Sequence, residues 1–202
     1  MNHSPLPLII ALAFFIVACN SESTANDEVK VAGRTLAGWT TDLESTNEIV
    51  RLRAVKSLGP FKEKAIDALA ACLTDSSDAV KYWAADHLGS VGKQVAQTES
   101  HQEIAKRLEA LAKDEKKAVS LAAAYALFQI NGTGKNLDRV IEKLRHPVRG
   151  VACSAAEFLG KIGPKAKASL AELESQFKNH KDYHVRGACQ NAIRKIKGQP
   201  VM

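Results

Sequence analysis

Five stretches of the chain share one pattern of small and apolar residues, and this repetition constrains the fold more than any other feature. In each stretch an aliphatic anchor is followed by small or apolar residues four, seven or eight, and eleven positions later. These offsets fall on one stripe of a helix with 3.6 residues per turn. The anchors are Val50, Val80, Val119, Val151 and Val185. Their spacings of 30, 39, 32 and 34 residues are typical of a solenoid of stacked helices.

Each of the first four stretches is followed, after a break, by a second and shorter apolar stretch. Two of the breaks are Gly59-Pro60 and Gly163-Pro164, where glycine tolerates a left-handed helix end and proline cannot continue the helix. The residues expected to face inward in the second helices are Ile66, Leu69 and Leu73; Ile104, Leu108 and Leu111; Leu137, Val140, Ile141 and Leu144; and Leu170, Leu173 and Phe177. The sequence therefore predicts an all-α fold built from helix pairs.

The two ends of the array should differ from its middle, because each must close an open apolar face. A short amphipathic helix around Trp39 is expected before the first pair, and the last first-type helix, which ends near Ile196, has no partner. Between repeats, polar turns such as Asp75–Asp78 and Lys181-Asp182 supply side chains that accept hydrogen bonds at a helix start.

The first-helix segments VKYWAADHLGSVG at residues 80–92 and VACSAAEFLGKIG at residues 151–163 resemble HEAT-like repeats of the phycobilisome-lyase type. The family's basic residue after the anchor is present at Arg51, Lys81 and Arg186 and absent at Ser120 and Ala152. The resemblance spans about residues 34–198 and implies an α-solenoid of about five HEAT-like helix-pair repeats in a right-handed superhelix. Members of the family include chromophore lyases, although most resemble binding scaffolds.

The first residues have a different character from the repeats. Leu6 to Ala18 is almost wholly apolar, about the length of a signal-peptide core and shorter than the roughly 20 residues that span a bilayer. It leads into Ile16-Val17-Ala18-Cys19, which resembles a bacterial lipobox, and the resemblance implies that Cys19 is acylated. The first four residues carry no Lys or Arg, which departs from the usual pattern and leaves an ordinary cleaved signal or a misplaced start codon open.

These observations predict four segments. Residues 1–18 would be a signal peptide, residues 19–33 the lipidated Cys19 with a polar tether, residues 34–198 the repeat domain, and residues 199–202 a tail. We therefore expect an exported protein of the cell envelope, held at a membrane by its N-terminal lipid and facing the periplasm if the cell has two membranes.

Charge is distributed unevenly along the chain. Residues 20–100 hold 9 Lys or Arg and 12 Asp or Glu, whereas residues 101–202 hold 19 and 10, a net charge of +9. Such a basic half favours association with acidic surfaces. Nucleic acid is not the expected partner, since no aromatic residues interleave with the charge and the export signal directs the chain elsewhere. The candidate contact residues are Tyr82, Lys106, Arg107, Lys143, Arg145, Lys165 and Lys167.

Several patterns that could carry chemistry have plainer explanations. No histidine is followed by glutamate, so the His-Glu dyads of helical-repeat metal hydroxylases are missing. His180 and His184 have metal-ligand spacing but flank a helix break. The run from Asn131 to Lys135 lacks the spacing of a phosphate-binding loop and reads as a turn. We therefore expect no metal, no cofactor and no catalytic residues.

The three remaining cysteines, Cys72, Cys153 and Cys189, each lie within a helical pattern. Cysteine without a disulfide behaves as a small apolar residue, so buried thiols are expected. An odd number of cysteines in an exported chain also leaves at least one thiol unpaired or intermolecular.

Taken alone, the sequence favours a monomeric, non-catalytic scaffold that binds a protein of unknown identity. A chromophore-lyase-like enzyme or enzyme subunit is the alternative. A lyase that serves cytoplasmic pigments should lack an export signal, so the segment that ends at Cys19 discriminates between the two.

Overall fold

A computed structural model describes residues 29–114 and 117–200. Within these residues the helices are α1 Leu36–Asp42, α2 Glu48–Leu58, α3 Ile66–Cys72, α4 Asp78–Ser90, α5 Gly92–Val95, α6 His101–Ala112, α7 Lys117–Asn131, α8 Gly134–Glu142, α9 Arg149–Ile162, α10 Leu170–Asn179 and α11 Tyr183–Ile196. Three 3₁₀ segments join them, namely η1 Gly59–Ala65, η2 Lys143–Arg145 and η3 Gly163–Ser169.

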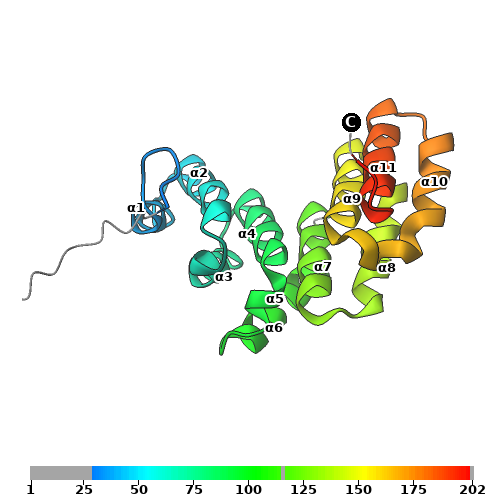
Figure 1. The fold of residues 1–202 in the computed structure, drawn as a ribbon. Coiled ribbons are helices and arrows are strands. Elements are labelled where there is room, and N and C mark those ends of the chain that lie inside the picture. The colour runs from blue at the N-terminus through cyan, green and yellow to red at the C-terminus, as the bar shows by residue number, and fades with distance from the viewer. Residues whose placement is uncertain (1–28, 115–116, 201–202) are drawn as a thin grey trace, which may run out of the picture.

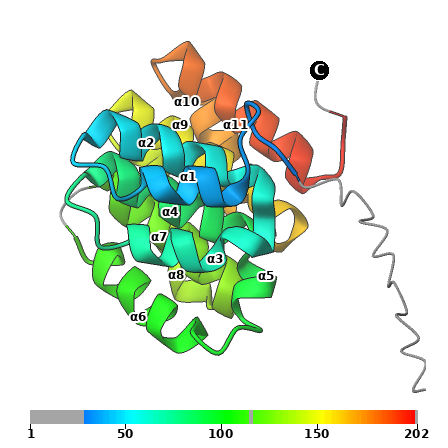
Figure 2. The same cartoon turned by 90° about the vertical axis from the view of Figure 1, so that its left-hand side faces the viewer.

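The helices form a solenoid, as the repeat pattern predicts. Helices α2, α4, α7, α9 and α11 are the first helices, and each contacts the next in a row (Figure 1). The second helices α3, α6 and α8 lie on the lower side of that row in both views, whereas α10 lies higher, beside α11 (Figure 2). Helix α1 stands at one end and the unpaired α11 at the other, so the predicted all-α solenoid is confirmed. None of the helices in the described part of the chain is long and apolar enough to cross a membrane.

The predicted stripe is the core of the solenoid. The anchors Val80, Val119 and Val185 are at most 1% exposed, and the alanines four residues after an anchor, Ala84, Ala123 and Ala155, are fully buried together with Cys189. The exception is the first anchor, Val50, which is only half-buried. It lies in α2 at the end of the row, next to the short α1.

The arginine that follows the first and the last anchor forms hydrogen bonds to the turns next to its helix. Arg51 donates to both carboxylate oxygens of Asp75 at 2.8 and 3.0 Å and also to the carbonyl oxygen of Ser45, so it ties together the turns at both ends of its helix pair. Arg186 donates in the same way to the carbonyl oxygens of His180 and Lys181. The hydrogen bond from Arg51 lowers the pKa of Asp75. These side chains replace water at exposed carbonyl groups between helices.

The turns between repeats cap the first helices as predicted. The side-chain oxygens of Asn47, Ser77 and Asp182 accept hydrogen bonds from backbone N–H groups of α2, α4 and α11. Helix α9 differs, because its N-cap is Val148 and makes no such bond. The imidazole of His146 accepts a hydrogen bond from the backbone N–H of Val148 at 3.0 Å and shapes that turn instead.

Two details of the second helices differ from expectation. Gly163 ends α9 with a φ of 68°, whereas Gly59 has a helical φ of −51°. Glycine is needed at position 59 because the side chain of His87 lies very close to its backbone. A Cβ atom there would sit 2.6 Å from Cε1 of His87. Phe177 was expected to face inward and is 36% exposed, so that prediction is wrong. It lies in the last turn of α10, where the described residues leave it partly uncovered.

The close contact between α4 and α7 depends on Gly89. A Cβ atom on this residue would lie 2.4 Å from the ring of Tyr125 and 3.1 Å from the backbone of Ala126. Replacement by alanine must therefore push the two helices apart. Gly187 on α11 has open space where its Cβ would be.

We predict opposite effects for alanine at these two glycines. Gly89→Ala should destabilise the fold by about 1–3 kcal/mol through overpacking. Gly187→Ala should stabilise it by roughly 0.5–1 kcal/mol, because alanine favours the helix. Urea denaturation followed by circular dichroism measures both. Equal midpoints for the two variants would contradict the packing of α4 on α7.

Burial of His87 predicts a pH-dependent stability. Its Nε2 is buried without a hydrogen-bond partner, and burial is the main cause that lowers its pKa below the ordinary 6.5, against the opposing effect of Asp86. In the unfolded chain His87 therefore takes up a proton first as pH falls. Stability is complete above about pH 6.5 and declines below it, since the unfolded state then binds more protons.

The corresponding test compares the wild type with His87→Phe. The free energy of unfolding of the wild type should fall between about pH 7.5 and about pH 5, a range above that in which ordinary carboxylates titrate. The variant should lose much of this slope while keeping its helix content. A slope of the same size in both proteins would show that His87 does not cause it.

Candidate functional site

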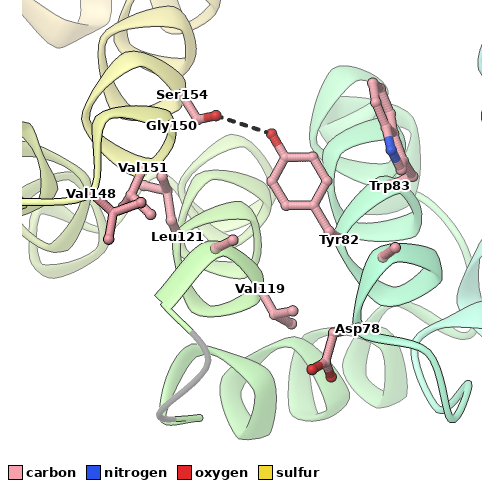
Figure 3. A pocket seen from close by; sticks show the side chains of 11 residues that line it. Asp78, Tyr82, Trp83, Val119, Leu121, Val148, Gly150, Val151 and Ser154 are labelled. Atoms are coloured by element: carbon pink, nitrogen blue, oxygen red, sulfur yellow. Dashed lines mark hydrogen bonds between the residues drawn. The ribbon is translucent and has the colours of Figure 1, made fainter. Parts of the chain in front are cut away.

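An open groove of about 670 Å³ lies across the first halves of α4, α7 and α9 (Figure 3). Most of its lining is apolar, and the side chains come from three successive first helices. The lining residues are Asp78, Ala79, Tyr82 and Trp83 of α4, Ala118, Val119 and Leu121 of α7, and Gly150, Val151 and Ser154 of α9 together with Val148 before it. The groove therefore lies on the row of first helices.

The groove exists because α4 and α9 meet across α7. The hydroxyl of Tyr82 donates to Oγ of Ser154 at 3.4 Å, and Nζ of Lys161 donates to the carboxylate of Asp86 at 2.6 Å. Both contacts join α4 to α9, although α7 lies between these helices in the chain. They hold the row in a bend, and the groove is the hollow at one end of that bend.

An aromatic cluster forms the base of this bend. The ring of Tyr125 stacks on Phe158 with centroids 4.4 Å apart, and Tyr82 lies 6.2 Å from Phe158 and edge-on to Trp83 at 5.6 Å. Lys161 lies over the rings of Tyr125 and Phe158. Burial raises the pKa of Tyr82, so its hydroxyl stays protonated and able to donate at neutral pH.

The groove also contains two aromatic residues that are neighbours in sequence, Tyr82 and Trp83. The structure places both half-buried and both in the groove, with Lys56 over the indole of Trp83 at 4.9 Å. Trp83 is therefore part of the surface of the molecule and not of its core.

Two ion pairs lie near the groove, one beside α4 and one beside α9. On the α4 side, Asp78 and Lys81 form an ion pair at 2.8 Å. On the α9 side, Arg149 follows the lining residue Val148 in sequence but does not itself line the groove, and its guanidinium lies 4.0 Å from the carboxylate of Asp182, the N-cap residue of α11. Helix α9 also begins without an acidic residue in its first turn.

The groups near the groove suit binding better than catalysis. Ser154 is the acceptor of Tyr82 and has no base bonded to it. Burial raises the pKa of Cys153, which keeps this thiol protonated. In residues 29–114 and 117–200 no three His, Cys, Asp or Glu side chains gather as a metal site would require. His180 ends α10 and His184 lies in α11, so they stand on different helices.

The other two cysteines are buried free thiols, with a pKa that burial raises to about 11 for Cys72 and about 12 for Cys189.

The structure separates Tyr82 from the six basic candidates. Lys106 and Arg107 lie on α6, Lys143 and Arg145 on η2, and Lys165 and Lys167 on η3. Three of the six pair with acids, as Arg107 does with Glu103, Lys143 with Glu142, and Arg145 with Glu172. Lys106, Lys165 and Lys167 are exposed. Cys19 lies outside the described residues.

Sequence reasoning missed the groove residues of α7 and α9. Val151 was recognised as an anchor of the stripe, but its partial access to the groove was not foreseen. One signal was available, namely that Val148-Arg149-Gly150 lacks the Asn, Ser or Asp that caps α2, α4 and α11.

The sequence matches a known family of repeats, and the fold is similar to those of solved repeat proteins. A family model described as HEAT repeats matches residues 36–99 and 104–194. No protein of curated function matches the sequence. Among solved structures, the complex of CpcE and CpcF of phycocyanin lyase from Nostoc sp. PCC7120 is 22% identical, with 89% of this chain and 70% of that chain covered and a TM-score of 0.53.

Two further solved structures, one of a designed and one of an engineered protein, have TM-scores close to this value. A designed armadillo repeat protein in complex with the peptide (KR)4 is 18% identical, with 80% of this chain and 81% of that chain covered and a TM-score of 0.50. An engineered protein is 20% identical, with coverages of 81% and 79% and a TM-score of 0.50. At these identities the likeness concerns the fold alone.

The pair of Lys161 and Asp86 allows a test of the bend. The Asp86 side chain is 6% exposed and that of Lys161 is 39% exposed. Lys161→Met should destabilise the protein by about 1–3 kcal/mol, because a buried carboxylate loses its partner. Adding Asp86→Asn should recover part of the loss. The exposed Lys178→Met serves as the control, with an expected change below about 0.5 kcal/mol in chemical denaturation. If Lys161→Met behaves like the control, the contact does not hold the bend.

Proposed function

The chain belongs to the HEAT-repeat family, and we propose that it is a monomeric, non-catalytic scaffold that binds a partner protein at the bacterial cell envelope. The groove across α4, α7 and α9 is the observation that carries this proposal. It exposes aromatic and aliphatic side chains of three helices in one hollow. Exposed apolar surface of this kind marks binding sites on soluble domains.

The basic half of the chain supports a partner with an acidic surface. Lys106, Lys165 and Lys167 are exposed and come from two separate segments. Such charge raises the rate at which an acidic partner meets the surface and contributes less to the final affinity. The other three candidates, Arg107, Lys143 and Arg145, already pair with acids within the chain. We therefore assign the attraction of an acidic partner mainly to Lys106, Lys165 and Lys167.

Attachment to the membrane is the second part of the proposal. It rests on the apolar segment from Leu6 to Ala18 and on the lipobox-like residues that end at Cys19. Nine residues, and therefore ten Cα–Cα steps, lie between Cys19 and Val29, where the described structure begins. A fully extended chain of that length spans at most about 35 Å. A lipid on Cys19 would therefore keep the N-terminal end of the solenoid close to the bilayer, facing the periplasm if the cell has two membranes.

A chromophore-lyase-like role remains the alternative. The likeness to the phycocyanin lyase complex is its support, and at 22% identity this likeness concerns the fold. An export signal would separate the chain from cytoplasmic pigments, so the fate of residues 1–19 decides between the two roles.

The anchor is tested with Cys19→Ala. We predict that the wild type partitions into the detergent phase on phase separation and that the variant is unprocessed or water-soluble. Several acyl chains anchor a protein stably, whereas a single chain binds only marginally. Mass spectrometry of the mature N-terminus provides the second readout. Wild-type protein in the aqueous phase with an unmodified Cys19 would refute the anchor.

Partner binding is tested by cross-linking in native membranes followed by identification of the captured protein. Reversal of Lys106, Lys165 and Lys167 to Glu should lower the yield and reduce its dependence on salt, because surface charges are screened beyond about 8–10 Å. Reversal of Lys62, Lys64 and Lys93, which are exposed residues of the N-terminal half, is the control of equal charge. Equal yields from the two triple variants would make the basic half a feature of solubility only.

A further inference from the structure

Four of the turns that precede the first helices contain the same hydrogen bond. In each, the side chain two residues before the N-cap accepts the backbone N–H of the N-cap residue itself. The acceptors are Oγ of Ser45, Oδ1 of Asp75, Nδ1 of His146 and Nδ1 of His180, at distances of 3.2, 2.7, 3.0 and 3.0 Å. The N-caps are Asn47 of α2, Ser77 of α4, Val148 of α9 and Asp182 of α11. The two C-terminal turns therefore depend on imidazole rings, where the two N-terminal turns use oxygen.

This hydrogen bond fixes the protonation state of each ring. Because the backbone N–H donates, Nδ1 of His146 and of His180 carries no hydrogen, and the ring is neutral with its hydrogen on Nε2. Imidazole side chains in water take up a proton at about pH 6.5, and both ring nitrogens are then donors. A protonated ring therefore opposes one N–H group to another, and the bond is lost. The hydroxyl of Ser45 does not titrate, and the hydrogen bond from Arg51 lowers the pKa of Asp75, so the N-terminal turns do not respond to mild acid.

The surroundings of His146 give a protonated ring no compensation. Its Nε2 is buried without a hydrogen-bond partner. The turn follows η2, which packs against α8, α9 and α10. The charged groups around it include Lys143 with Glu142, Arg145 with Glu172, Arg149 with Asp182, and Asp138 in the hollow beside Arg145. Charging the ring thus costs the bond to Val148, and no hydrogen bond to a carboxylate in the described part of the chain replaces it.

The turn at His180 is bordered mainly by positive charge. Nη1 of Arg186 on α11 donates to the carbonyl oxygen of His180 at 2.7 Å. Other charged or titratable groups near this turn are Lys178 of α10, Lys181 and Asp182 of the turn itself, His184 of α11, and Arg149 of α9, which pairs with Asp182. A proton on His180 therefore adds to a local excess of positive charge, which favours opening of the turn.

His101 has the opposite arrangement. Its Nδ1 lies 2.9 Å from the carbonyl oxygen of Thr98. A carbonyl oxygen only accepts, so Nδ1 of His101 donates. Protonation adds a hydrogen at Nε2 and leaves this bond intact. The chain thus contains a histidine whose hydrogen bond does not depend on pH, and it serves as an internal control.

We propose that the turns before α9 and α11 form a pH-sensitive device. In mildly acidic solution His146 and His180 take up protons, their turns open, and the starts of the two C-terminal first helices are released. Helices α2 and α4 keep their turns, because Ser45 and Asp75 still accept. Val148 lines the groove, so the released segment includes part of the groove wall on the α9 side. The device does not depend on which partner the groove binds.

The test follows hydrogen exchange of the full chain, purified in detergent, by mass spectrometry. Protection is compared at about pH 7.5 and about pH 5.5, on either side of the ordinary imidazole value, after correction for the intrinsic effect of pH on exchange. Peptides from the starts of α9 and α11 should lose about tenfold in protection, the factor expected one pH unit below that value. Peptides from the starts of α2 and α4 should change by less than about twofold, because their turns stay closed.

Asparagine keeps the acceptor and removes the titration. In the double variant His146→Asn and His180→Asn, the amide oxygen accepts the same N–H and does not titrate. The starts of α9 and α11 should then keep their protection at both pH values, and each single variant should restore only its own helix. His101→Asn is the matched control and should respond as the wild type does. His87 is unchanged in all these proteins, so its effect on global unfolding is the same in each.

NMR of the ring nitrogens in wild-type protein with isotope-labelled histidine gives a readout that needs no variant. In neutral solution His146 and His180 should carry their hydrogen on Nε2, and His101 should carry it on Nδ1. A hydrogen on Nδ1 of His146 or His180 would overturn the inference. So would unchanged protection at α9 and α11 in acid, an equal loss at all four turns, or the same response in the wild type and the double variant.

Discussion

The structure depends on the close approach of successive first helices. Fully buried alanines at the centre of the stripe, such as Ala84 and Ala155, and glycines at the contacts bring the backbones together. Gly89 lies against Tyr125 of the next helix, and a Cβ atom on Gly160 would lie 3.3 Å from the backbone of Ala192 on α11. Small residues bury less apolar area than large ones, so this core gains stability from dense packing over many contacts.

The same close approach produces the surface on which the proposed function rests. Because α7 presents small side chains between its neighbours, α4 and α9 come within reach of each other over it. Lys161 then bonds to Asp86 and Tyr82 to Ser154, and Tyr125 and Phe158 stack beneath them. The Asp86 carboxylate is buried, so removing its partner Lys161 would leave it unpaired at a cost in stability. The pair therefore fixes the bend that opens the groove.

The sequence predicted the fold well because periodic patterns report local structure. The stripe of small residues, the second helices and the caps at Ser77 and Asp182 all follow from spacing and residue type within one helix or turn. The errors arise where distant residues meet. Gly59 is required by the ring of His87, and Phe177 is 36% exposed although its spacing matches that of the buried Leu173. The groove combines residues 72 positions apart, such as Tyr82 and Ser154, and no local pattern pairs them.

The central claim is that the face formed by α4, α7 and α9 binds a protein. It is tested most directly by site-specific photo-cross-linking in living cells, with a benzoylphenylalanine at Ala118 in the groove or at Tyr183, which is 67% exposed on α11. The account predicts a discrete adduct of higher mass from Ala118 and none from Tyr183. Adducts from Tyr183 alone, or from neither position, would contradict it.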